Sequence, residues 1–289
     1  MKQKIYTTIG LMILFTCSVI AQDNLLKELE KDQKANNKVT GAFKSSRVIN
    51  GHSMEMLGAG MLDFRILHRF GPVKQGIGDL FGLDQASMRM GFDFGLSNDL
   101  TIGFGRTTFK KEYDAFIKYR LIHQEQASTP VSLVAVAGTS IFTYKSPDPL
   151  KPLTFNDRTG YYAQLIIGRK FNEAFSLQLS PTLVYRNMID PADKKTIYAL
   201  GIGARHKISK RVALVVDYSL VANGLPMSVG TNPLSIGVDI ETGGHVFQLH
   251  FSNSTGMNER SFITETTNSW SKGEFQFGFN LSRIFSLKK

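Results

Sequence analysis

The chain has 289 residues, a formal net charge of +10, 42% apolar residues and a single cysteine. Its basic residues are spread along the whole length and do not form the cluster typical of nucleic-acid-binding proteins, so we expect no nucleic-acid partner. After residue 21 no apolar run approaches the roughly 18 residues that a transmembrane helix needs, which excludes helical membrane spans from that part of the chain.

Residues 1–21 predict a cleaved signal peptide. Lys2 and Lys4 precede an apolar run from Ile9 to Ile20, and small Ala21 stands at the cleavage position. A short positive segment followed by a short apolar one is the pattern of a secretory signal, not of a retained membrane helix. An alternative is a lipoprotein lipidated at Cys17, but the residues before this cysteine, Phe15 and Thr16, are not the small ones such a signal needs.

Cleavage after Ala21 changes the composition of the mature chain. Cys17 is lost, so we expect no disulfide, no thiolate metal site and no cysteine nucleophile. Two of the 34 basic residues are also lost, and the remaining 32 against 24 acidic residues give a net charge of +8.

Residues 22–57 differ from the rest of the chain. The stretch from Asp23 to Lys38 is rich in charged and amide side chains, with one apolar cluster at Leu25, Leu26 and Leu29, and the stretch from Thr40 to His52 has no clear period. We expect either a periplasmic N-terminal arm, through which a periplasmic partner can bind, or a partial plug folded into the domain that follows.

From Gly58 onward apolar and polar residues alternate again and again, which is typical of strands with one apolar face. We predict an all-β fold over residues 58–289: a transmembrane antiparallel up-and-down β-barrel of about twelve strands, with ten or fourteen as the neighbouring even counts. The alternation is weakest in 130–143, and 234–240 is short. The expected strands are 58–70, 86–97, 99–109, 113–123, 130–143, 159–171, 174–187, 195–208, 211–221, 234–240, 243–253 and 273–285.

The connections between these strands alternate in length. Asn, Asp, Ser and Gly residues suited to tight turns follow the second, sixth, eighth and tenth strands, at 98–99, 172–173, 209–210 and 242–243. Longer polar connections follow the first, fifth, seventh, ninth and eleventh strands. The segments 110–112 and 124–129 break the contrast in length without breaking parity. Short periplasmic turns opposite longer outer loops are typical of outer-membrane barrels, and an even count places both termini in the periplasm.

A large soluble β-sandwich is the rival fold, because its strands also alternate. Its outward face would be charged, whereas the polar face here is rich in Gly, Ser, Thr and Gln. Tyr and Phe residues also gather near the predicted strand ends, as in the aromatic girdles of membrane barrels. Both observations favour the barrel and a location in the bacterial outer membrane.

The last predicted strand supports this interpretation. Phe275, Phe277, Phe279, Leu281 and Phe285 share one face, which looks like the C-terminal signal that barrel-assembly machinery recognises during biogenesis. The chain departs from the typical signal because four residues, Ser286 to Lys289, follow the last aromatic residue.

Five stretches of the chain carry a family resemblance: FKSSRVINGHS at 43–53, LDFRILHRFG at 62–71, LFGLDQ at 80–85, DIETGGHVFQLH at 239–250 and FITET at 262–266. Together they resemble an uncharacterised family of bacterial outer-membrane β-barrel proteins of unknown function, and the resemblance covers nearly all of the mature chain. It implies the barrel and its location, and it implies no activity and no functional residues.

The sequence offers no convincing catalytic, cofactor or metal site. His245 and His250 are an odd number of positions apart and point to opposite faces of one strand, and His52 with Glu55 lacks a third ligand nearby. His206 and Ser209 are too close on one strand and its turn to form a phospholipase-like arrangement across strands. The Gly-x-Gly pairs at 103–105 and 201–203 lie within strands, so they are not phosphate-binding loops. We therefore expect no enzyme and no cofactor.

The most informative polar set faces the predicted lumen, where basic residues outnumber acidic ones nine to three. In an open pore this lining would favour anions; in a closed barrel the same side chains would pair across strands and brace it. The favoured function is a narrow passive pore for small, anionic solutes, and the alternative is a non-conducting structural or partner-binding barrel. The predicted lumen residues are Asp63, Arg65, Arg69, Arg89, Asp93, Lys118, Arg120, Lys170, Arg186, Arg205, Arg211 and Asp217.

Overall fold

The structure, a computed structural model, describes residues 37–126, 128–146, 150, 152–187, 194–223, 230–242 and 245–287. The predicted signal peptide and residues 22–36 lie outside these ranges, as does the predicted turn residue Gly243.

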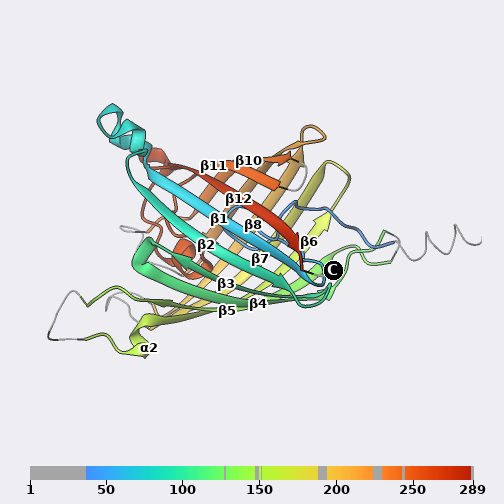
Figure 1. The fold of residues 1–289 in the computed structure, drawn as a ribbon, viewed down its shortest axis with the longest axis horizontal. Coiled ribbons are helices and arrows are strands. Elements are labelled where there is room, and N and C mark those ends of the chain that lie inside the picture. The colour runs from blue at the N-terminus through green and yellow to red at the C-terminus, as the bar shows by residue number, and fades with distance from the viewer. Residues whose placement is uncertain are drawn as a thin grey trace, which may run out of the picture.

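Within these ranges twelve strands form one closed antiparallel barrel (Figure 1). Each strand pairs with its neighbours in sequence, and β1 closes the barrel by pairing with both β2 and β12. The predicted up-and-down barrel of about twelve strands is confirmed. The strands are β1 (Met61–Pro72), β2 (Ala86–Gly95), β3 (Leu100–Thr107), β4 (Glu112–Ile122), β5 (Ser132–Phe142), β6 (Thr159–Lys170), β7 (Phe175–Arg186), β8 (Thr196–Lys207), β9 (Val212–Val221), β10 (Leu234–Thr242), β11 (His245–Ser252) and β12 (Gln276–Ser286).

The two faces of the wall follow the alternation of the sequence. In β2, Met90 and Phe92 are 40% and 47% exposed on the outside, whereas Arg89 and Asp93 are buried on the inside. Apolar side chains outside and polar ones inside reverse the arrangement of a soluble sandwich, which excludes that rival. A closed sheet also leaves no edge strand with unpaired backbone groups, as a membrane span requires.

The two ends of the barrel differ. The turn end carries the short β2–β3, β6–β7 and β8–β9 links, the β4–β5 link at 123–131, and both ends of the described chain, which lie on the right in Figure 1. The loop end carries the longer links between β1 and β2, β5 and β6, β7 and β8, β9 and β10, and β11 and β12. This is the parity that the sequence predicts.

Short helices occur only in the connections of the described chain. The helices are η1 (Val73–Gln75), η2 (Ile77–Gly82), η3 (Phe109–Lys111), α2 (Phe155–Arg158), α3 (Glu259–Thr264) and η4 (Trp270–Lys272). Among the described residues, no helix has both the length and the apolar character to cross a bilayer.

The weak alternation of β5 has a physical cause. Its inward residues Val134 and Val136 are as apolar as its outward residues Leu133, Ala135 and Ala137, and both valines are fully or almost fully buried. An apolar residue on the inner face of a barrel needs an apolar partner inside. Part of the lumen must therefore be filled by other segments of the chain.

Candidate functional site

Two segments fill the lumen. Residues 37–57, named here the plug segment, enter from the turn end, and residues 253–266 of the β11–β12 connection, named here the inward loop, fold in from the loop end. The plug segment is almost entirely buried from Ala42 to Met54, and every residue of α3 in the inward loop is buried.

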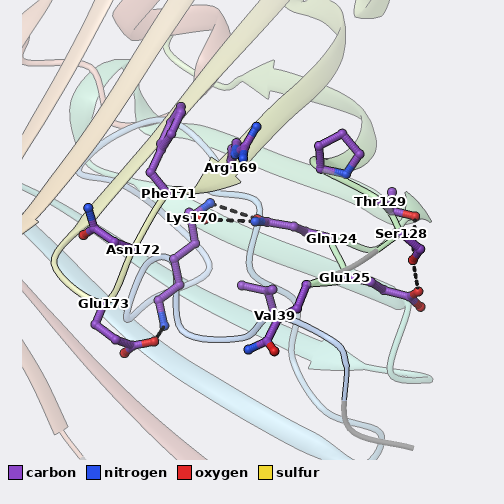
Figure 2. Close-up of a pocket in the computed structure, with 12 residues that line it drawn as sticks. Val39, Gln124, Glu125, Ser128, Thr129, Arg169, Lys170, Phe171, Asn172 and Glu173 are labelled. Atoms are coloured by element: carbon purple, nitrogen blue, oxygen red, sulfur yellow. Dashed lines mark hydrogen bonds and ion pairs between the residues drawn. The ribbon is translucent and has the colours of Figure 1, made fainter. Parts of the chain in front are cut away.

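The plug segment enters the barrel beside the β4–β5 link. Val39 N–H donates to the carbonyl of Gln124 at 2.8 Å, and Gln126 N–H donates to the carbonyl of Asn37 at 3.0 Å. The side-chain amide of Gln124 exchanges two hydrogen bonds with the backbone of Lys170, at 2.8 and 2.9 Å. Figure 2 shows Val39, Gln124 and Lys170 among the residues that line an open pocket of about 320 Å³ on the rim. The chain therefore enters the lumen at a fixed place.

Inside the barrel the plug segment makes a tight hairpin. Val48 N–H donates to the carbonyl of Gly51 at 2.9 Å, and Ser53 N–H donates to the carbonyl of Ser46 at 3.0 Å. The tip of the hairpin rests on the carboxylate of Asp217 in β9, whose Oδ2 accepts N–H groups of Asn50 at 2.8 Å and Gly51 at 2.9 Å. A buried carboxylate with several backbone donors is a strong acceptor, so Asp217 fixes the depth of the hairpin.

The same side of the hairpin is hydrogen-bonded to β1, β10, β11 and β12, and we name this boundary with the wall the polar seam. The carbonyl of Val48 accepts from Gln248 at 2.6 Å, the carbonyl of Ile49 accepts from Asn280 at 3.0 Å, and the side chain of Asn50 contacts both Ser235 and Arg69. One cavity of about 10 Å³, about the space that one water molecule needs, lies along this seam beside Gln248 and Asn280, and a second of the same size lies between the plug and the inner face of β6–β9.

The opposite side of the plug is apolar. Phe43, Val48 and Met54 pack with Phe262 and Ile263 of the inward loop and with the inner face of the wall from β4 to β8. The wall residues of this cluster are Phe116, Val134, Val136, Tyr162, Ile166, Val184, Ile197 and Ala199. Apolar contacts thus gather on the β4–β8 side of the plug, where Gln178 of β7 also exchanges two hydrogen bonds with the plug backbone, at 2.9 Å with Met54 and 2.7 Å with His52.

The plug segment and the inward loop meet at a buried ion pair. Arg47 Nη1 lies 2.9 Å from Glu259 Oε1, and both side chains are 1% exposed. Arg47 Nη1 also donates to the carbonyl of Asn50 at 2.7 Å. The plug segment and the inward loop, joined here by residues 212 positions apart, therefore fill the lumen together.

His52 stands beside this pair. Its Nε2 lies 3.1 Å from the hydroxyl of Tyr162 and 3.4 Å from both Arg47 and Glu259, and its ring packs edge-on against Phe116. Burial lowers the pKa of His52 well below its ordinary value of 6.5, and the positive charges of Arg47 and Lys118 lower it further. His52 is therefore neutral near pH 7, and its Nε2 can accept the Tyr162 hydroxyl proton in a hydrogen bond.

The inward loop is fixed to the wall by a second set of ion pairs. Arg260 contacts Glu112 at the start of β4 through two bonds of 2.6 and 2.9 Å, and it contacts Glu265 at 2.6 Å. Lys110 reaches Glu265 at 2.9 Å. Burial alone would raise the pKa of Glu265, but Arg260 and Lys110 together hold it below its ordinary value of 4.5.

Most of the predicted lumen residues lie inside the barrel. Asp63, Arg65, Arg69, Arg89, Asp93, Lys118, Arg186, Arg205 and Asp217 are all buried. Arg120 and Lys170 are half-buried near the turn end. The assignment of Arg211 to the lumen was wrong. Arg211 has the parity of an inward residue, but it is exposed and lies in the turn before β9, where parity does not fix the direction of a side chain.

Sequence reasoning missed the acidic partners of these basic residues. Asp114 binds Arg89 through two bonds of 2.9 and 2.5 Å, and Arg205 lies near both Asp239 and Glu241. Asp114 and Lys118 are an even number of positions apart in one strand and therefore face the same side. This signal could have assigned Asp114 to the lumen. With these partners and Glu112 added and Arg211 removed, the set of lumen residues holds seven acidic residues against eight basic ones, and not three against nine.

Two basic residues of the wall are held by neutral groups. Lys118 Nζ donates to the plug carbonyls of Ser46 at 3.2 Å and Glu55 at 2.5 Å. Arg69 donates to Asn280 and to Asn50. Plug carbonyls and amides therefore take the place of carboxylates, which links the charge of the wall to the position of the plug.

No group of three or more His, Asp, Glu or Cys side chains within the described ranges is arranged to hold a metal ion. Glu55 uses its carboxylate to accept the backbone N–H groups of Ala42 and Phe43, and His52 faces Glu259 and Tyr162. The chemistry of this site is therefore hydrogen bonding and ion pairing between the plug and the wall.

A closed antiparallel barrel with an apolar outer face defines an integral outer-membrane β-barrel. Residues 43–285 match the family described as "Membrane bound beta barrel domain (DUF5777)", and the chain belongs to this family. A search of curated proteins returned no match.

The chain is also similar to solved structures of outer-membrane barrels. The KdgM porin has 7% identity and a TM-score of 0.46 over 78% of this chain and 99% of its own. The COG4313 outer membrane channel from Pseudomonas putida F1 has 12% identity and a TM-score of 0.47 over 81% and 98%. Omp33 from Acinetobacter baumannii has 6% identity and a TM-score of 0.41 over 78% and 98%.

Proposed function

We propose that the protein is a gated outer-membrane pore for small solutes, held shut by the plug segment and the inward loop. The observation that carries this proposal is the polar seam. Along it the plug meets the wall through hydrogen bonds beside a water-sized cavity. Water can replace such bonds at little cost, so the seam is where a path for solutes can open.

The filled lumen argues against a narrow passive pore, the function that the sequence favoured, if that pore had to be open in the arrangement described. Asp217, Arg69 and Gln248 would line an open pore, yet each of them is buried against the plug. Conduction therefore requires the hairpin to move away from β1 and β9–β12.

The charge of the wall also changes the expected selectivity. The seam is bordered by Asp93, Asp217 and Asp239 as well as by Arg65 and Arg69. Because the seam is bordered by three acidic and two basic residues, we expect no strong preference for anions.

A non-conducting structural barrel is the second candidate, and the ion pairs favour it. The pairs from Arg47 to Glu259 and from Arg260 to Glu112 join the plug segment, the inward loop and the wall in one arrangement. In this case the plug never leaves, and a periplasmic partner of the N-terminal arm would use the barrel as an anchor. Neither proposal gives the protein a catalytic role or a cofactor.

Planar-bilayer recording of the refolded full chain separates the two candidates. We expect the wild type to be closed for most of the time and Asp217→Ala to open more often, because the variant removes the acceptor at the tip of the hairpin. Asp114→Asn is the matched control, since Asp114 pairs with Arg89 and not with the plug. Folded Asp217→Ala protein that shows no conductance steps would contradict the gated pore and favour the structural barrel.

A further inference from the structure

The β1–β2 connection at the loop end carries an exposed apolar cluster that the lumen does not use. Ile77 is 77% exposed, Leu80 51%, Phe81 49% and Leu83 41%, and we name these four residues the apolar knob. Figure 1 shows this connection projecting from a corner of the barrel beyond the ends of β1 and β2. Soluble loop tips rarely gather four large apolar side chains, so such a cluster marks a contact surface.

The backbone holds the knob in a fixed and strained shape. Leu80 and Phe81 have φ angles of 47° and 56°, in the left-handed region that residues with a branched or bulky side chain rarely adopt. Phe81 N–H donates to the carbonyl of Gly76 at 2.7 Å, and Gly82 packs so closely on Gly71 that a side chain would not fit between them. Strained backbone that the surrounding structure maintains points to a function for the side chains it presents.

The base of the connection is tied to the β12 side of the barrel. Val73 N–H donates to the carbonyl of Phe275 at 2.9 Å, Lys74 N–H donates to the carbonyl of Gly273 at 3.0 Å, and Lys74 Nζ pairs with Glu274 at 3.2 Å. The knob therefore has a defined position relative to the outer face of β1 and β12.

That outer face carries an aromatic cluster at the loop end. Phe70 stacks on Phe277 at 5.8 Å between ring centroids, Trp270 stacks on Phe275 at 4.8 Å, and Phe251 meets Phe275 edge-on at 5.6 Å. Trp270 donates its ring N–H to the carbonyl of Leu234 at 3.0 Å. Aromatic side chains at the end of a lipid-facing wall mark the boundary between membrane and water.

We propose that the apolar knob inserts into the lipid leaflet at the loop end and anchors the barrel beside β1 and β12. The partner of the knob is lipid, because the knob is tied to the aromatic boundary of a wall whose outer face already lies in the membrane. This inference rests on the barrel spanning the membrane and not on the gated pore, so the two can fail separately.

Tryptophan fluorescence tests the proposal, because Trp270 is the only tryptophan in the chain. In a Trp270→Phe background, Phe81→Trp places the single reporter in the knob, and Ile77→Trp gives a second reporter at a residue with ordinary backbone. Each protein is refolded into phosphatidylcholine vesicles whose acyl chains are brominated either near the headgroup or near the methyl end. Heat-modifiable migration on a gel shows which variants have folded.

We expect bromine near the headgroup to remove more than half of the fluorescence of a folded knob reporter, and bromine near the methyl end to remove less. Lys194→Trp in the same background is the control, since Lys194 is an exposed polar residue in another connection at the loop end. It should be quenched by aqueous acrylamide and not by brominated lipid. Knob reporters that acrylamide quenches and brominated lipid does not would overturn the proposal. Reporters shielded from both would indicate a protein neighbour and would also overturn it.

Discussion

Replacing Glu259 with glutamine removes the carboxylate that joins the inward loop to the plug segment. The variant keeps the volume of the side chain but leaves the Arg47 guanidinium buried without a charged partner. Arg47 Nε already has no hydrogen-bond partner among the described residues, so the cation has little to replace Glu259. Removing one partner of a buried ion pair typically costs about 3–5 kcal/mol of folding free energy. We expect Glu259→Gln to lower the free energy of unfolding by that amount.

The double variant Arg47→Met with Glu259→Leu distinguishes the loss of the ion pair from the cost of leaving one charge buried alone. It removes both charges together, and apolar replacements of a buried pair are often neutral or stabilising. We expect it to recover most of the stability lost in Glu259→Gln. Glu274→Gln is the control, because Glu274 pairs with the half-exposed Lys74 on the surface, where a pair contributes roughly 0–1 kcal/mol.

Unfolding is measured by urea titration of refolded protein, with the fractions of folded and unfolded chain read from their different migration on a gel. The reasoning predicts a large shift of the midpoint for Glu259→Gln, a small one for Glu274→Gln and recovery in the double variant. Equal shifts for the two single variants, or a double variant less stable than Glu259→Gln, would show that the central pair does not hold the two segments together.

Three further predictions concern His52, Glu265 and Gly138. The pKa of His52 is lowered by burial below 6.5, so the unfolded chain binds more protons than the folded one. The contribution of His52 to stability is therefore full above pH 6.5 and is lost as pH falls through the folded pKa. We expect acidification to lower the urea midpoint and to make the channel open more often, and His52→Gln to remove that part of the pH dependence. Glu265 has a pKa below 4.5, so its contribution is present above pH 4.5 and is lost on further acidification; Glu265→Gln should lower stability at neutral pH and flatten the acid limb of an unfolding titration. Gly138→Val should lower stability by about 1–3 kcal/mol, because a Cβ there meets the ring of Tyr162; Ala137→Val, on the lipid-facing side of the same strand, should change the urea midpoint little.

The barrel could be predicted because its signals are local. Alternation with a period of two places Met88, Met90, Phe92 and Phe94 on one face of the strand and Arg89 and Asp93 on the other. The register of β1 with β2 keeps that division. Strand ends fell within a few residues of the observed ones, since turn residues mark them. In β5, the strand with the poorest alternation, the inward Val134 and Val136 belong to the apolar cluster that contains Phe43 and Phe262.

The plug could not be predicted because its contacts are not local. Residues 40–52 have no period, since a hairpin inside a barrel has wall on every side and no solvent face. Its partners Asp217 and Glu259 lie more than 160 residues away. The sequence left the arm and the plug open as alternatives for residues 22–57, and the described part of that range lies in the lumen. The inward fold of the β11–β12 connection was not anticipated, because its polar composition is typical of an outer loop.

The two sides of the plug decide in which direction it can move. On the apolar side, exposing Phe43, Met54 and their neighbours to water costs about 25 cal/mol for each Å² of apolar surface, and water offers nothing in return. Along the polar seam each hydrogen bond to Gln248 or Asn280 can be exchanged for one to water, with a net loss of roughly 0.5–1.5 kcal/mol. In the gated pore that we propose, the seam is therefore expected to open before the apolar contacts break, so that the plug stays on β4–β8 while a path forms along β1 and β9–β12. An opening that instead exposed the apolar side would require the larger cost first, which is why Asp217, and not Phe116, is the residue to change in order to open the barrel.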